Sequence, residues 1–236
     1  MKYLSAAIVL AVLILVACAA PPPVAMTEGD DALSVQLAPD SSLDIEARLE
    51  LVAGIQAWTS WAAAGQEGDP GWFPSAYYRE LKQFLAPYRT HPAFGLTQEM
   101  QDRGFMYDTV PELVLLSRHG LEFDLPEQGF PEHLIRRAGG EQQLRDLLAA
   151  WRSLARDCGF ATFFNGHRDY YHQLASRLCR NLQARRISQW MQAFFGATGH
   201  QAFHYVLGPA LTPGGGYGVS IQTTAGAETV HHLYQI

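Results

Sequence analysis

HQAFHYVLGPALTPGGGYGVSIQTTAGAETVHHLYQI, residues 200–236, contains the strand-forming sequence that decides the fold class. Residues 200–211 alternate and carry β-forming side chains, and GGGYG at residues 214–218 interrupts this pattern. Residues 218–224 and 228–236 again have the composition of strands. We therefore predict a short antiparallel sheet in this part of the chain.

The sequence before this sheet is predominantly helical. Residues 41–65 offer a serine cap, acids in the first turn and apolar residues at helical spacing, and residues 74–92 are amphipathic. Further helices are expected over residues 92–103, 109–118, 141–157, 160–184 and 187–195. The predicted fold class is α+β, with a mostly helical N-terminal body followed by the short antiparallel sheet in a single domain.

The final residues, HHLYQI, end the sequence on an apolar stretch without a charged tail, whereas termini are usually polar. A three-stranded sheet that exposed such an apolar edge would be prone to aggregation. We therefore expect residues 43–236 to be a single, mostly helical domain that is truncated at its C-terminus.

The first residues, MKYLSAAIVLAVLILVACAA, have the layout of an export signal, with Lys2, an apolar run and small residues before Cys18. LVAC at residues 15–18 resembles a bacterial lipobox, so residues 1–18 are predicted to be a lipoprotein signal peptide and Cys18 the lipidated residue. An uncleaved anchor or a plain secretory signal is the alternative, although the apolar run is short for a spanning helix. Ala19 favours the outer membrane, facing the periplasm of the bacterial cell envelope.

Residues 19–42 are rich in proline, small and acidic residues and are predicted to be a disordered tether. The 236 residues carry a net charge of -6, which argues against a nucleic-acid partner. Apart from Cys18 there are two cysteines, Cys158 and Cys179. An oxidising compartment permits a disulfide between them, and two buried thiols are the alternative.

Histidine pairs are the candidates for a metal site. His200 and His204 have the H-x-x-x-H spacing, but Gln201 replaces the glutamate of the zinc-protease motif and the local pattern is strand-like. His231 and His232 point to opposite faces of a strand. We therefore predict no metal ligand among them.

Other polar residues give no catalytic pattern. GGGYG lacks the lysine and hydroxyl of a phosphate loop and is better suited to a hairpin or to close backbone approach by a ligand. No G-x-S-x-G elbow is present. Asp102, Asp108 and Glu112 are explained by capping near the helix start at Thr109.

Several segments together resemble a bacterial family of exported proteins, domain of unknown function 4932. They are AYYRELKQFLAPYRTHPAF, QDRGFMYDTVPELVLLS, GFATFFNGHRDYYHQL, ISQWMQAFFG and VLGPALTPGGGYG, in this order. The resemblance implies the first part of a gluzincin-like zinc metallopeptidase domain, whose H-E-x-x-H helix follows the glycine-rich strand. This sequence contains no such motif, so the resemblance assigns no catalytic residue and no cofactor here, and zinc only to a longer protein.

By the same resemblance, a strand containing Gly214, Gly215, Gly216 and Tyr217 pairs with an extended peptide substrate. The first hypothesis is thus an exported lipoprotein, membrane-anchored through its lipid, that holds a fragment of a metallopeptidase domain. The alternative is a complete, non-catalytic lipoprotein that binds a peptide or an envelope partner. A third hypothesis, a small metal-binding lipoprotein, needs His200, His204 or His232 to converge.

Overall fold

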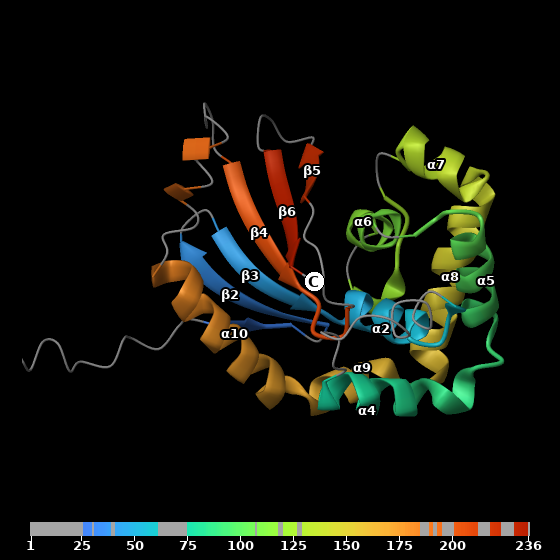
Figure 1. Cartoon of the computed structure of the whole chain (residues 1–236), viewed down its shortest axis with the longest axis horizontal. Helices are drawn as coiled ribbons and strands as arrows, with labels where there is room; N and C mark the ends of the chain where they lie inside the picture. Colours follow the sequence, from blue (N-terminus) through green and yellow to red (C-terminus); the bar gives the residue numbers. More distant parts are fainter. Residues whose placement is uncertain are drawn as a thin grey trace, which may run out of the picture.

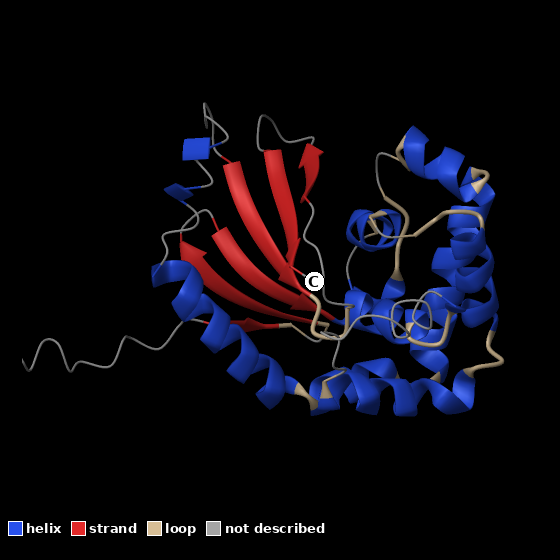
Figure 2. Cartoon of the chain, in the orientation of Figure 1, coloured by secondary structure: helices blue, strands red, loops and turns tan. Residues whose placement is uncertain are grey.

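The computed structural model of the chain describes residues 26–29, 31–38, 41–60, 75–106, 108–117, 120–126, 129–184, 189–190, 193–194, 201–211, 218–222 and 229–235. Within these residues the strands gather in one half of the molecule and most helices in the other (Figure 2). None of the described helices is long and apolar enough to span a membrane.

Six strands form one mixed sheet in the order β1-β2-β3-β4-β6-β5. The strands are β1 (Met26–Glu28), β2 (Ala32–Ala38), β3 (Ser41–Glu46), β4 (Gln201–Leu207), β5 (Gly218–Gln222) and β6 (Thr229–Gln235). Neighbours are antiparallel except for the β3–β4 and β4–β6 pairs, which are parallel. The predicted α+β class is confirmed, whereas the prediction of a purely antiparallel sheet built only from the end of the sequence is wrong.

The early strands lie where a tether and a helix start were predicted. In β2, Leu33 and Val35 are buried and alternate with more exposed residues, and in β3 the buried Leu43 and Ile45 pair with Val35 and Leu33. This two-residue period buries one face of each strand. The segment therefore forms strands although its composition predicted a tether. The predictions of a tether through residue 42, of a domain start at residue 43 and of a helix from residue 41 are therefore wrong here.

The helical body follows β3 directly (Figure 1). Its helices are α2 (Ala47–Gln56), α4 (Ala76–Leu85), η1 (Ala86–Tyr88), α5 (Pro92–Asp102), α6 (Thr109–Leu116), η2 (Gly120–Glu122), α7 (Glu132–Ala138), α8 (Glu141–Asp157), α9 (Phe160–Gly166) and α10 (Arg168–Ala184). The predicted helix over residues 160–184 is divided at His167, and α7 was not predicted. The expected helix over residues 187–195 lies largely outside the described residues.

Helix starts follow familiar side-chain rules. The Ser75 side chain accepts a hydrogen bond from the Tyr78 amide at the start of α4, and the His91 side chain accepts one from Ala93 at the start of α5. Between α8 and α9, Gly159 has a φ of 65°, a left-handed conformation that glycine adopts without strain.

The core joins the two halves of the molecule. Helix α2 is buried along its length from Ala47 to Ile55, and Trp151 of α8 is fully buried, with its Nε1 donating to Thr97 Oγ1 at 3.0 Å. Helix α10 packs along the sheet against β2 and β3 (Figure 1). The last strand in sequence, β6, lies inside the sheet between β4 and β5, a position for which an apolar sequence is typical.

Candidate functional site

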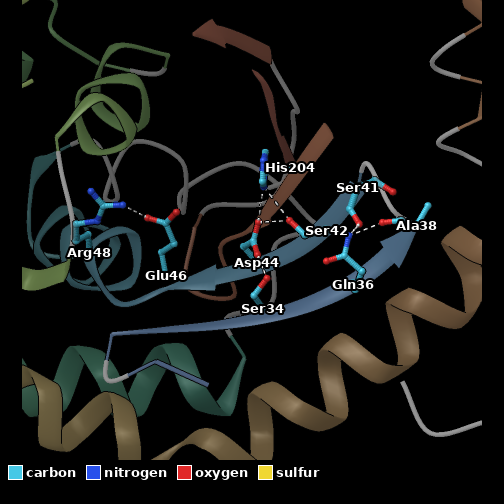
Figure 3. Close-up of polar contacts among 9 residues, drawn as sticks. All are labelled: Ser34, Gln36, Ala38, Ser41, Ser42, Asp44, Glu46, Arg48 and His204. Atoms are coloured by element: carbon cyan, nitrogen blue, oxygen red, sulfur yellow. Dashed lines mark hydrogen bonds and ion pairs between the residues drawn. The ribbon is translucent and has the colours of Figure 1, made fainter. Parts of the chain in front are cut away.

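Four polar side chains from three strands meet on one face of the sheet (Figure 3). Ser34 lies in β2, Ser42 and Asp44 in β3, and His204 in β4. The register brings them together, because Ser34 pairs with Asp44 and Ser42 pairs with His204. Paired residues, and residues two apart in one strand, share a face of the sheet. We refer to these four residues as the polar cluster.

Asp44 is the centre of the polar cluster. Its Oδ1 accepts a hydrogen bond from Ser34 Oγ at 2.5 Å, and its Oδ2 accepts one from Ser42 Oγ at 2.7 Å. His204 Nδ1 lies 3.4 Å from Asp44 Oδ2 and 2.9 Å from Ser42 Oγ. The side chain of Asp44 is 15% exposed and that of His204 is 37% exposed, so the histidine reaches solvent and the carboxylate is mostly enclosed.

These contacts decide the charge of Asp44. Burial by itself raises the pKa of the carboxyl group, but hydrogen bonds with His204, Ser34 and Ser42 outweigh it, and the pKa of Asp44 is lowered below its ordinary value. Asp44 is therefore an anion at neutral pH.

The polar cluster differs in geometry from a nucleophilic triad. In a serine–histidine–aspartate triad, serine and aspartate contact opposite nitrogens of the imidazole ring. Here the Ser42 hydroxyl and the Asp44 carboxylate both meet Nδ1 of His204. The cluster orients the His204 ring and joins β3 to β4, and it lacks the two-nitrogen arrangement of the triad.

Two further contacts in Figure 3 secure the ends of β3. Gln36 Nε2 donates to the Ser41 carbonyl at 3.1 Å and to the Ala38 carbonyl, which closes the turn between β2 and β3. At the other end, the guanidinium of the largely buried Arg48 pairs with the Glu46 carboxylate and donates to the Ser117 carbonyl at the end of α6. Both contacts fix the position of the strand.

A second polar group, buried between the body and the sheet, was missed by the sequence analysis. Glu50 of α2 is fully buried, and its Oε1 accepts from the Ala210 amide, which follows β4, at 3.4 Å. Burial raises the pKa of Glu50 to about 8, against smaller opposing effects of the Tyr77 hydroxyl and the Ala210 amide. Nearby, the Tyr77 and Tyr171 hydroxyls share a hydrogen bond of 2.7 Å. The Glu50 carboxyl is thus mostly protonated at neutral pH.

The predicted peptide-binding and lipidation residues lie outside the described part of the chain. This applies to Gly214, Gly215, Gly216, Tyr217 and Cys18. Strand β5 begins directly after them, at Gly218, and lies at the end of the sheet order. The structure thus places the segment that follows the glycine run at a sheet edge.

The strand register brings two of the candidate histidines, His204 and His232, to paired positions in β4 and β6. His204 lies in strand β4, as its strand-like pattern predicts, and His200 lies outside the described residues. In β6, His232 pairs with His204 and His231 pairs with Phe203. The described residues contain no group of three or more His, Cys, Asp or Glu side chains that could hold a metal ion.

The remaining candidates have structural partners. Asp108 precedes α6 but makes no capping hydrogen bond, so the capping prediction is wrong for this residue, whose carboxylate pairs instead with Arg137 at 2.9 Å. Glu112 pairs with His133, and Asp102 accepts from Gln98.

Cys158 and Cys179 are both buried free thiols, so the structure has two thiols rather than a disulfide between them.

A comparison of the chain with known protein-family models, with curated proteins and with solved structures finds no match in any of the three.

Proposed function

We propose that this protein is an exported bacterial lipoprotein, anchored in the envelope through Cys18, that binds an extended peptide along strand β5. The observation that carries the proposal is the strand order, in which β5 lies at one end of the sheet with β6 on its inner side. An edge strand presents backbone amides and carbonyls that an incoming strand can pair with.

The two edges of the described sheet differ in a way that favours β5. At the other edge, β1 is only three residues long and ends in Glu28, and short charged edges resist strand addition. Strand β5 has five residues, GVSIQ, with no charge and no proline. Strand β5 itself therefore lacks the charged and proline residues by which proteins often block a sheet edge.

The resemblance described above supports the same location, since it implies peptide pairing at the glycine-rich segment that leads into β5. The metallopeptidase activity that the resemblance also implies stays a prediction, because its H-E-x-x-H motif does not occur in this sequence. Peptide binding at β5 requires only the backbone of the strand.

The proposal is tested with proline substitutions at successive residues of β5. In an antiparallel ladder, neighbouring residues alternate between facing the partner strand and facing away from it. Of Val219→Pro and Ser220→Pro, one removes an amide directed at β6 and the other an amide directed at the open edge. We expect the variant that loses the open-edge amide to stay folded, as judged by circular dichroism. Its affinity for a fluorescent unfolded polypeptide, reduced and carboxymethylated α-lactalbumin, should fall about tenfold or more.

Hydrogen exchange provides an independent measurement on the unaltered protein. Binding of the same probe should slow exchange at alternate amides of β5 and leave β1 unchanged. Probe binding without protection of β5, or an unchanged affinity in the folded proline variant, contradicts the proposal.

A further inference from the structure

An exposed aromatic pair follows helix α10. Trp190 is 58% exposed and Phe194 is 69% exposed, and their rings stack with centroids 5.4 Å apart. The described residues around them, 189–190 and 193–194, are helical, and a spacing of four residues places both rings on one helix face. The only other large hydrophobic side chain exposed among the described residues is Leu125, at 40%. Burial in the protein therefore does not explain this pair.

The sequence around the aromatic pair is basic, although the whole chain carries a net charge of -6. Residues 170–227 contain no aspartate or glutamate, and their charged residues are Arg177, Arg180, Arg185 and Arg186. Arg177 and Arg180 are exposed on α10. Positive charge is thus concentrated within the residues that lead up to Trp190, a distribution that attracts an anionic surface.

The fold places α10 near β1, the first described strand after Cys18 in the sequence. Helix α10 packs against β2, and β2 pairs with β1, the first described strand (Figure 1). Met26 is eight positions after Cys18, and a fully extended chain of eight residue steps spans about 26–29 Å. A lipid on Cys18 would therefore keep α10 and the residues after it within reach of the bilayer surface.

We propose that Trp190 and Phe194, together with Arg177 and Arg180 of α10, dock the folded domain onto an anionic phospholipid surface. This inference rests on the anchoring part of the proposed function. Aromatic side chains partition to the interface between lipid and water, and arginines near a membrane are attracted by anionic headgroups. A lipid chain combined with a basic patch binds a membrane more stably than the chain alone.

The test uses the mature chain, residues 18–236, with Cys18→Ser so that no acyl group contributes to binding. Cosedimentation is measured with vesicles of phosphatidylcholine and with vesicles of phosphatidylcholine and phosphatidylglycerol in equal amounts. We expect binding to the phosphatidylglycerol vesicles only, reduced about tenfold or more by Trp190→Ser/Phe194→Ser and, separately, by Arg177→Gln/Arg180→Gln. The matched controls are Leu125→Ser and Arg103→Gln/Arg136→Gln, which alter exposed residues elsewhere and should bind like the parent chain.

A fluorophore on Ala193→Cys reports the position of the segment directly. Burial raises the pKa values of the Cys158 and Cys179 thiols to about 11, which favours labelling of the new exposed thiol. Its emission should shift to shorter wavelength when phosphatidylglycerol vesicles are added.

Three results would overturn the inference: an unshifted emission, equal vesicle binding by the aromatic double variant, or a dimer in solution that this variant dissociates. Because the assay uses neither an acyl group nor a peptide, these results are distinguishable from a failure of the proposed function. That failure would appear in the probe-binding measurements and in lipid labelling of Cys18.

Discussion

The Oγ of Ser42 and the Nδ1 of His204 lie 2.9 Å apart although the two residues are 162 positions apart in the sequence. Their strands, β3 and β4, form a parallel pair, and the whole described helical body lies between them in the chain. A parallel pair needs a long crossover connection, and such non-local pairings are slow to form because a long loop must be closed. The polar cluster is therefore a clamp that holds the strands before the helical body to the strands after it.

Replacement of the clamp's central residue, Asp44→Asn, should destabilise the protein by about 1–3 kcal/mol at pH 7. The reason is that the amide nitrogen of asparagine cannot accept the hydrogen bonds that the serines donate to the carboxylate. Urea unfolding monitored by circular dichroism measures the free energy of unfolding.

The same variant should change the response to acid. The pKa of Asp44 is lower in the folded protein than its ordinary value of 3.8. Its contribution to stability is thus present above that value and is lost as the pH falls through the folded pKa. The parent should lose stability in this acid range more steeply than Asp44→Asn. The exposed Asp146→Asn is the control, and equal slopes for Asp44→Asn and the parent would show that Asp44 is not stabilised by the cluster.

Glu50→Gln should stabilise the protein at neutral and alkaline pH. The folded pKa of Glu50 is raised to about 8, so between its ordinary value of 4.5 and 8 the unfolded state has lost a proton that the folded state retains. The free energy of unfolding therefore falls as the pH rises through this window. Glutamine has a similar shape and no charge to bury, so we expect a gain of roughly 1–3 kcal/mol at pH 8 and little difference at pH 4.5.

Urea midpoints between pH 4.5 and pH 8 measure this effect for Glu50→Gln, for the parent and for Glu99→Gln, whose carboxylate is exposed. A parallel pH dependence of Glu50→Gln and the parent would mean that Glu50 ionises at an ordinary pH.

The hydrogen bond between the Tyr77 and Tyr171 hydroxyls should appear as coupling in a double-mutant cycle. Tyr77→Phe leaves the buried Tyr171 hydroxyl without this partner and should cost about 1–3 kcal/mol. Because the double variant removes both hydroxyls, Tyr77→Phe/Tyr171→Phe should cost less than the sum of the two single changes. Additive costs would show that the two hydroxyls do not depend on each other.

The helical body could be predicted from local patterns to a large extent. Helix α8 has the bounds expected from its sequence, residues 141–157, because its apolar residues recur at helical spacing on one buried face. Strand β4 was predicted from alternation within its own residues. In both cases the signal lies inside the element.

What could not be predicted depends on partners far away in the sequence. Ser42 and Asp44 were assigned to a helix start, because a serine and an acid before an apolar run are also a capping pattern. Their partner, His204, was weighed as a metal ligand and interpreted as a surface or edge-strand histidine, with no link to Ser42 or Asp44. Glu50 was missed because an amphipathic helix normally exposes its acids, whereas α2 is buried on all sides. No local pattern reports that a helix will be covered by both a sheet and other helices.

Lipidation at Cys18 should be abolished by Cys18→Ser. The parent chain, expressed in a bacterial host with its signal, should incorporate radiolabelled palmitate and fractionate with membranes. The variant should incorporate none, because acylation requires the thiol. Since Cys158 and Cys179 are buried, their replacement by alanine should leave the label unchanged. Incorporation by Cys18→Ser would contradict the assignment of the lipobox.

The two buried thiols should react only when the protein unfolds. Both are free in the structure, and burial raises the pKa of each to about 11, so the reactive thiolate is scarce at neutral pH as well as enclosed. In the mature Cys18→Ser chain, Ellman's reagent should titrate no thiol rapidly in the native state and both in denaturant. Stability should be the same with and without a reductant, since no disulfide restrains the unfolded chain. A reductant-dependent loss of stability would instead reveal a bond between Cys158 and Cys179.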